Sequence, residues 1–466
     1  TSSSSSKSSS KSSSLTKKNG NGAAAKRGGG EDVAPPHGGN PKTQKDFFIK
    51  LAKAVASKAL DRGYLPDVLT RLGCRILARQ QLRHCEEACR MATKSRDLLS
   101  GLTEALKSYV ATLKRSPVAV CTKEANDQHY EVDERFYGLV LGPRRKYSAC
   151  YYTRYEGPKT VAMRHPRDAA SASANLPKAE LASLEQVAKR ARIDQDTRTI
   201  LDLGCGWGSA SLFLAEKFPK AKVVGVSNSN SQREYILRQA SERGLSNLDV
   251  ATLNLATSDL TPALDKLRGL LSSGGGPEKE AAAGGETTTT TPSPVSFERA
   301  VSVEMFEHMK NYDALFGKIA AVLTPLTGTL FVHVFCHRQY AYHFVARSES
   351  DWMARHFFSG GTMPSANLFY FFANTPDATF AVLDHWRQVG SHYALTGEAW
   401  LQNMDRHKPA IMDIFAQTYP DPVVWWNRWR AFFISLTQLF GLDNGQEWGI
   451  AHYLFQVRPK PKKDRE

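Results

Sequence analysis

The sequence predicts an α/β protein whose core is a doubly wound, parallel sheet. Three observations carry this prediction. Short apolar runs typical of buried strands alternate with helical stretches through the middle of the chain. A glycine-rich turn joins the first of these strands to the first of these helices. Apolar residues make up 41% of the 466 residues, which is enough to bury a core.

The sheet and its helices are expected between about residues 199 and 335. The strands are predicted at Thr199–Leu203, Lys222–Val226, Leu248–Asn254, Phe297–Val303 and Gly328–Phe335. The helices between them are predicted at Ser209–Lys217, Gln232–Arg243 and Tyr312–Leu323. We assign residues 151–336 to this sheet domain. A Gly- and Thr-rich stretch at 269–296 is expected to be a low-complexity surface insertion.

The flanking regions differ in composition from the sheet domain. Residues 1–42 are rich in Ser, Gly and Lys and are predicted to be disordered. Residues 43–150 form a predicted helical region, in which Val68–Arg83 and Glu86–Leu113 are separate helices and Asp67 caps the first of them. Residues 337–457 are dense in Phe, Tyr and Trp, which favours an aromatic-rich helical lid with the final strands. Residues 458–466 are a basic tail.

The positive charge of the chain lies mostly in these ends. The formal net charge is +15 and the pI about 9.4, values that invite a nucleic-acid interpretation. Residues 1–30, however, carry six basic and no acidic side chains, and residues 458–466 carry five basic and two acidic ones. Nine of the fifteen excess charges therefore lie in the tails, and we expect no nucleic-acid partner.

The cysteines and apolar runs indicate the compartment. Seven cysteines, an odd number without CxxC spacing, favour a reducing compartment and no disulfide framework. No run of 18 apolar residues is present, so we expect no integral membrane segment. A cytoplasmic location is predicted, while the acid-free Ser/Lys-rich start leaves organelle import open. His84, Cys85 and Cys89 are close on one predicted helix, but such spacing is usually core, and no metal is expected.

The glycine-rich turn is the most informative short motif. It reads Leu201-Asp202-Leu203-Gly204-Cys205-Gly206-Trp207-Gly208. Its glycines, Gly204 and Gly206 among them, let a backbone approach a ligand closely. Dinucleotide-binding enzymes use a related turn, but here an acid precedes the glycines and Ser209 stands at the third glycine position of that fingerprint. The motif instead resembles motif I of class I S-adenosylmethionine methyltransferases, which have a Rossmann-like fold.

The end of the second predicted strand carries no carboxylate. The sequence there is Ser227-Asn228-Ser229-Asn230-Ser231-Gln232. Asn228 and Gln232 could act as neutral hydrogen-bond partners for ribose hydroxyls. The alternative is that this stretch is a loop with Ser231 as the cap of the next helix.

Longer motifs extend the resemblance to one family. Ser227-Asn228-Ser229 with Gln232, and Glu304-Met305-Phe306-Glu307-His308-Met309-Lys310-Asn311-Tyr312, resemble the (S)-coclaurine N-methyltransferase family of plant amine methyltransferases, which is related to the cyclopropane fatty acid synthases. The similarity covers about residues 45–457. It implies S-adenosyl-L-methionine as cofactor and a small, aromatic or alkaloid-like amine as substrate.

The resemblance also implies roles for individual residues. Cofactor-binding positions are expected at Ser148, Asp202, Gly204, Gly206, Asn228, Gln232, Asn254 and Leu255; the last two stand where the family has an Asp-Ile pair. Catalytic positions are expected at Glu304, Glu307 and His308, with His308 suited to accept the amine proton. Substrate contacts are expected from His337, Tyr342 and Trp352.

Two other functions stay open at this point. A cyclopropane synthase-like enzyme would act on unsaturated phospholipid acyl chains, and its relatives carry a cysteine where this chain has Phe433. A non-catalytic scaffold would keep the fold without turnover, although the intact Gly204–Gly208 and Glu307–Tyr312 motifs argue against it. A homodimer is a further expectation.

Overall fold

The computed structural model describes most of the chain from residue 55 onward. The described ranges are 55–92, 97–120, 132–153, 170–273, 294–344 and 352–459. The predicted tail 1–42, residues 274–293 of the predicted insertion, and the basic tail beyond residue 459 lie outside these ranges.

A seven-stranded mixed sheet forms the centre of the fold, with the strand order β3-β2-β1-β4-β5-β9-β8. The strands are β1 (Thr199–Leu203), β2 (Lys222–Ser227), β3 (Leu248–Thr252), β4 (Arg299–Val303), β5 (Thr329–His337), β8 (Phe380–Val389) and β9 (Trp448–Val457). The first five strands of this order are parallel, while β9 is antiparallel to both β5 and β8. The sheet departs from the all-parallel expectation only at this edge, where the carboxyl third of the chain supplies two strands.

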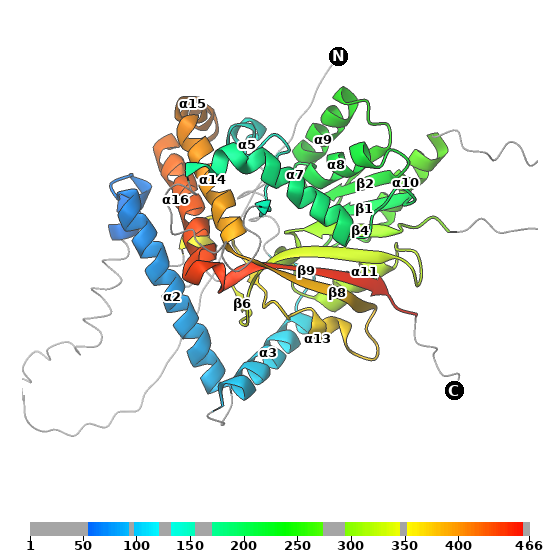
Figure 1. Cartoon of the computed structure of the whole chain (residues 1–466), viewed down its shortest axis with the longest axis horizontal. Coiled ribbons are helices and arrows are strands. Elements are labelled where there is room, and N and C mark those ends of the chain that lie inside the picture. The colour runs from blue at the N-terminus through cyan, green and yellow to red at the C-terminus, as the bar shows by residue number, and fades with distance from the viewer. Residues whose placement is uncertain are drawn as a thin grey trace, which may run out of the picture. The chain divides into compact units, whose positions relative to one another are not determined.

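The sheet is covered on both faces, as a doubly wound fold requires (Figure 1). Alternate strand residues point to opposite sides; Ile200 belongs to one hydrophobic cluster and Leu201 to the other. The first cluster includes α7 (Ala172–Arg190), α8 (Ser209–Lys217) and α9 (Asn230–Glu242). The second includes α10 (Thr261–Ser273), α11 (Tyr312–Ala320) and α13 (Tyr370–Ala373). The α/β prediction is confirmed.

The carboxyl third adds a helical layer beside the sheet. It consists of α12 (Trp352–His356), α14 (Ser391–Arg406), α15 (Lys408–Thr418) and α16 (Pro422–Phe440). Its aromatic side chains pack on one another; the Phe357 and Phe432 rings stack with centroids 4.5 Å apart, and Trp429 is fully buried among them. The expected aromatic cluster is therefore present in this helical region.

The amino-terminal helices differ from the prediction. One continuous helix, α2 (Asp67–Met91), replaces the two predicted to meet near residue 84, and α3 (Leu98–Arg115) follows it. No glycine or proline interrupts residues 78–91, so nothing breaks the helix there. Asp67 does not cap α2; it is the first helical residue and pairs with Arg430 on α16 at 2.9 Å. The short α5 (Glu134–Val140) also belongs to this region.

The helices after β2 and β4 begin in different ways. Ser229, and not Ser231, caps α9, because its hydroxyl accepts the Gln232 N–H. A 3-10 turn, η2 (Phe306–His308), follows β4 directly. The short elements β6 (Tyr342–His343), β7 (Thr362–Met363) and η3 (Leu442–Gly445) also lie in the described ranges.

The register of the sheet determines which segments meet. Leu203 on β1 pairs with Ser302 on the parallel neighbour β4. The glycine-rich turn and Glu304 therefore leave the sheet side by side, at the carboxyl edge where open α/β sheets bind ligands.

Candidate active site

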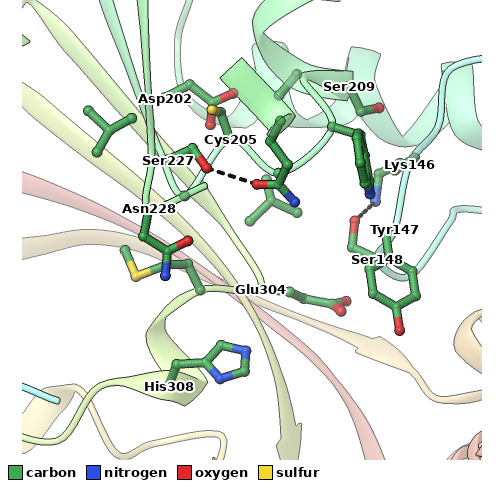
Figure 2. Close-up of a pocket in the computed structure, with 18 of the residues that line it drawn as sticks. Lys146, Tyr147, Ser148, Asp202, Cys205, Ser209, Ser227, Asn228, Glu304 and His308 are labelled. Carbon is green, nitrogen blue, oxygen red and sulfur yellow. Dashed lines mark hydrogen bonds between the residues drawn. The ribbon is translucent and has the colours of Figure 1, made fainter. Parts of the chain in front are cut away.

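A pocket lies at this carboxyl edge and encloses about 1460 Å³ of empty space, its open mouth included. Its wall combines the glycine-rich turn, the ends of β2, β3 and β4, the 145–148 segment, and side chains of the carboxyl third. The predicted site residues that line it are Ser148, Asp202, Gly204, Gly206, Asn228, Gln232, Asn254, Leu255, Glu304 and His308. Figure 2 shows several of these side chains facing the same space.

The glycines of the turn have backbone angles that side chains tolerate poorly. Gly204, Gly206 and Gly208 have φ angles of +74°, +53° and +76°. A Cβ at Gly204 would stand 2.5 Å from Met305 Cγ, and one at Gly208 would stand 2.5 Å from Ile236 Cγ1. A Cβ at Gly206 would meet no protein atom within 4 Å, and Gly206 lines the pocket. Two glycines therefore serve packing, while Gly206 keeps the space beside it open.

Asp202 lies at the back of the pocket. Its side chain is almost fully buried and accepts a hydrogen bond from Ser211 Oγ at 2.6 Å. Burial raises the pKa of Asp202 to about 6, against the lowering effect of that hydrogen bond. The carboxylate therefore fixes the turn to α8 as well as lining the pocket.

The β2 and β3 ends form a polar wall. Gln232 is buried and its Oε1 accepts the Ser227 hydroxyl at 2.8 Å, which fixes the amide (Figure 2). Asn228 is exposed at the rim of the pocket. Asn254 Oδ1 accepts the Ala256 N–H at 2.9 Å, and this turn holds the adjacent Leu255 against the pocket.

Two buried donors near the turn have no hydrogen-bond partner among the described residues. They are Ser209 Oγ, at the start of α8, and Trp207 Nε1. Both residues line the pocket. A buried polar group without a partner is costly, so these atoms suit a bound polar group, such as the carboxylate of an amino acid, at the amino end of the helix.

The Lys146–Ser148 segment closes the opposite side. Lys146 Nζ is buried and donates to Ser148 Oγ and to the Ala149 carbonyl, both at 2.6 Å. The Ser148 hydroxyl is thereby oriented toward the pocket, where Tyr147 lies next to it (Figure 2).

Glu304 extends into the pocket toward that segment (Figure 2). Its backbone φ is +51°, a left-handed conformation that few residues other than glycine adopt. One carboxylate oxygen accepts the Ala149 N–H at 2.8 Å and His333 Nε2–H at 3.2 Å, and the other accepts Tyr393 Oη–H at 2.8 Å. Burial alone would raise the pKa of Glu304, but the contact with His333, the Lys146 charge and the Ala149 N–H outweigh it and hold the pKa below its usual value. Glu304 is therefore an ionised carboxylate.

Glu307 is placed differently. Its side chain is fully buried, and it does not belong to the pocket wall. Its Oε1 accepts the Phe335 N–H at 2.7 Å, while its Oε2 has no hydrogen-bond partner among the described residues. Burial and the nearby Glu304 charge raise the pKa of Glu307 well above its usual value. Glu307 is therefore a neutral acid beneath the pocket, and it is not placed to pair with a cation inside it.

His308 lines the pocket beside Glu304. Its ring stacks on Phe358 with centroids 6.0 Å apart. Burial and the positive charge of Lys310 lower the pKa of His308 to about 4. The imidazole is therefore neutral at ordinary pH, and it is a weaker base than the unperturbed side chain on which the expectation of a proton acceptor rested.

The three predicted substrate contacts lie elsewhere. His337 is fully buried, and its Nδ1 accepts the backbone N–H groups of Gln339 and Tyr340. The Tyr342 hydroxyl accepts Trp448 Nε1–H at 3.1 Å, and Trp352 packs on Phe357. None of the three lines the pocket, and their contact with substrate stays a prediction.

Other residues of the pocket wall were not predicted from the sequence. Lys146, Trp207, Met305 and Tyr393 line the pocket, and two of them contact predicted site residues directly. Tyr393 stands 89 residues after the carboxylate to which it donates, so no local pattern could indicate it. The aromatic side chains on the wall are Tyr147, Trp207, Phe335, Phe358, Tyr393 and Phe432.

No group of three or more His, Cys, Asp or Glu side chains is placed to hold a metal ion in the described ranges. No helix in the same ranges is long and apolar enough to cross a membrane.

A family model and two relatives show which proteins this chain resembles. The family model "Mycolic acid cyclopropane synthetase" matches residues 120–268 and 291–440. (S)-coclaurine N-methyltransferase of Thalictrum flavum subsp. glaucum is 31% identical over 76% of this chain and 84% of that protein. The cyclopropane-fatty-acyl-phospholipid synthase of Escherichia coli is 25% identical over 68% of each.

Solved structures show the same relationship. A coclaurine N-methyltransferase bound to N-methylheliamine and SAH superposes with a TM-score of 0.69 at 27% identity, covering 87% of this chain and 99% of that one. The mycolic acid cyclopropane synthase CmaA1 superposes with a TM-score of 0.52 at 18% identity, covering 73% of this chain and 99% of that one, which is a likeness of fold.

Proposed function

The chain belongs to the mycolic acid cyclopropane synthetase family, and from this premise we propose that it is an S-adenosyl-L-methionine-dependent N-methyltransferase acting on a small, aromatic or alkaloid-like amine. The observation that carries the proposal is Glu304, an ionised carboxylate held by three donors inside a pocket that begins at a glycine-rich turn. A buried anion there suits a reaction in which positive charge moves from a sulfonium to an amine nitrogen.

The cofactor half of the pocket supports this assignment. The open backbone at Gly206 and the unsatisfied Ser209 hydroxyl suit the amino-acid end of the cofactor. Asn228, Gln232 and the Asn254–Leu255 pair suit its ribose and adenine. When bound, the cofactor supplies a methyl group on a positively charged sulfur.

The amine half of the pocket supplies orientation, a hydrogen-bond acceptor and a negative charge. Tyr147, Phe335 and Phe358 offer ring faces that attract cations by about 0.5–2 kcal/mol each. Holding the nucleophile in line with the methyl group can supply about 7–11 kcal/mol of the barrier. The neutral His308 imidazole accepts a hydrogen bond from an N–H of the bound amine, and Glu304 stabilises the ammonium charge.

Transfer to a phospholipid acyl chain is the alternative within the family. The 31% identity to an amine methyltransferase and Phe433 in place of a cysteine favour the amine. Modification of a phospholipid is therefore the alternative outcome of the test.

The test is a mass-spectrometric assay of the full chain with S-adenosyl-L-methionine. Separate reactions contain primary, secondary and tertiary benzylic amines, heliamine among them, or vesicles of unsaturated phospholipid. Methylated amine without modified lipid is the expected result. Modified lipid with no methylated amine contradicts the proposal.

We also propose a cytoplasmic homodimer. The six cysteines in the described ranges are free, which suits a reducing compartment. Exposed Leu69, Leu72 and Ile76 lie on one face of α2, where a second copy could cover them. Sedimentation analysis of the protein tests the dimer, and a fluorescent fusion tests the location.

A further inference from the structure

A line of buried polar side chains runs from Glu304 away from the pocket. His333 on β5 contacts Glu304, and the paired residue on β9, His452, contacts His333. Arg190, in the last turn of α7, contacts His452. Both histidines are about 1% exposed, so neither exchanges hydrogen bonds freely with water.

The distances make each step a hydrogen bond. Arg190 Nη1 is 2.5 Å from His452 Nδ1, and His452 Nε2 is 2.8 Å from His333 Nδ1. His333 Nε2 is 3.2 Å from the Glu304 carboxylate. The Arg190 guanidinium is also held over the Trp386 ring, at 5.0 Å from its centroid.

Arg190 and Glu304, at the two ends of this line, determine which side chain donates in each hydrogen bond. A guanidinium only donates, and an ionised carboxylate only accepts. His452 must therefore accept at Nδ1 and carry its proton on Nε2, which leaves His333 to accept at Nδ1 and to donate from Nε2. A doubly protonated His333 would force His452 to present an N–H to Arg190, where two donors would face each other. Burial is also the main influence that lowers the pKa of both histidines.

We infer that Arg190 and His452 are positioning residues that keep His333 a neutral donor to Glu304, so that the negative charge of Glu304 remains available to the cation in the pocket. An imidazolium at His333 would instead form an ion pair with Glu304 and compete with the substrate. This inference rests on the proposed function only for its last step, because the hydrogen-bond directions follow from the described side chains.

The first experiment reads the tautomers directly. The full chain, labelled with 15N-histidine and saturated with S-adenosylhomocysteine, is studied by long-range 1H–15N spectroscopy. His333 and His452 are expected to carry their protons on Nε2, with Nδ1 unprotonated. Protonation of His333 at Nδ1 in this spectrum overturns the inference, whatever the enzyme's activity.

The second experiment removes the donor. Arg190→Met is expected to introduce a second tautomer or a cationic form at His452 and His333. It is expected to lower kcat roughly tenfold, the lower end of the effect seen when the hydrogen-bond partner of a metal-ligating histidine is removed. The KM for the cofactor is expected to stay near the native value. Arg190→Lys, which keeps a donor, should recover part of kcat.

The control is Arg192→Met, which removes an equal charge two residues away. Arg192 pairs with exposed Asp384 and does not contact the histidines. If a folded Arg190→Met variant keeps the native tautomers and kcat, the inference is wrong. If Arg190→Met does not fold, the spectrum of the native protein decides. If the native protein methylates no amine, the proposed function fails while the spectrum still tests the hydrogen-bond direction.

Discussion

Glu304 is the residue on which the chemistry of the pocket depends most. It has a left-handed backbone, and backbone and side-chain donors from three distant parts of the chain hold its carboxylate. A strained backbone of this kind persists only where the surrounding structure holds the residue in place, and such residues are common at active sites. The arrangement keeps an anion in place within a largely apolar wall.

Replacing this anion should impair the reaction more than binding. Glu304→Gln keeps the shape but removes the charge, and we expect kcat to fall by at least about 100-fold. S-adenosylhomocysteine affinity, measured by calorimetry, should change far less. The control is Glu185→Gln, which alters a half-exposed surface carboxylate. Equal kcat values for the two variants would remove Glu304 from the mechanism.

The pKa of Glu307 is shifted in the opposite direction to that of Glu304, so its effect on stability can be tested by changing the pH. Its pKa is raised in the folded state, so the folded protein binds more protons than the unfolded chain above pH 4.5. Its contribution to stability is therefore present at low pH and is lost as pH rises.

Glu307→Gln removes this pH dependence. Urea unfolding at pH 5, 6, 7 and 8 should show the variant gaining stability relative to the native protein as pH rises, by at most about 1.4 kcal/mol per pH unit. Glu185→Gln should show no such trend. A difference between Glu307→Gln and the native protein that does not vary with pH would mean that Glu307 is ionised in the fold.

At the scale of elements, the glycine-rich turn joins sheet, helix and pocket. Its local pattern was sufficient to predict β1 and α8 to the residue, because an apolar strand, three glycines and a helix follow one another in sequence. The ends of β2, α9 and β5 differ from the prediction by at most two residues.

Predictions failed where a contact joins distant elements. α10 was not predicted before the insertion, and its apolar face is buried against β2 and β3. The expected substrate contacts His337, Tyr342 and Trp352 pack with Trp448, Phe357 and backbone groups, contacts that no local pattern indicates. The partners of Glu304 at positions 149, 333 and 393 come together only in the folded sheet.

The turn permits a matched pair of substitutions. Gly206→Ala and Gly208→Ala both place a side chain at positive φ, at a cost of about 1–2 kcal/mol. The Gly208 methyl also meets Ile236, whereas the Gly206 methyl projects into free space beside the pocket. Gly208→Ala should therefore lower Tm more, and Gly206→Ala should weaken S-adenosylhomocysteine binding more. Equal effects of the two variants on both measurements would contradict a cofactor site at Gly206.

At the scale of the whole molecule, the sheet brings the residues proposed for the cofactor and those proposed for the methyl acceptor to the same edge. Strands β1 to β3 present the glycine-rich turn and the polar wall, and β4 and β5 present Glu304, His308 and His333. The carboxyl third adds Tyr393, Phe358 and Phe432 over the same space. Cofactor and acceptor are thus expected to meet at Glu304, between the two halves of the wall.

The most direct test of this account is the destination of one labelled methyl group. The full chain is incubated with S-adenosyl-L-methionine carrying a 13C-methyl group, together with heliamine and vesicles of unsaturated phospholipid in one tube, and the products are read by 13C NMR. We predict the label on the amine nitrogen, and its loss with Glu304→Gln. Label in the lipid acyl chains, with none on nitrogen, would contradict the account.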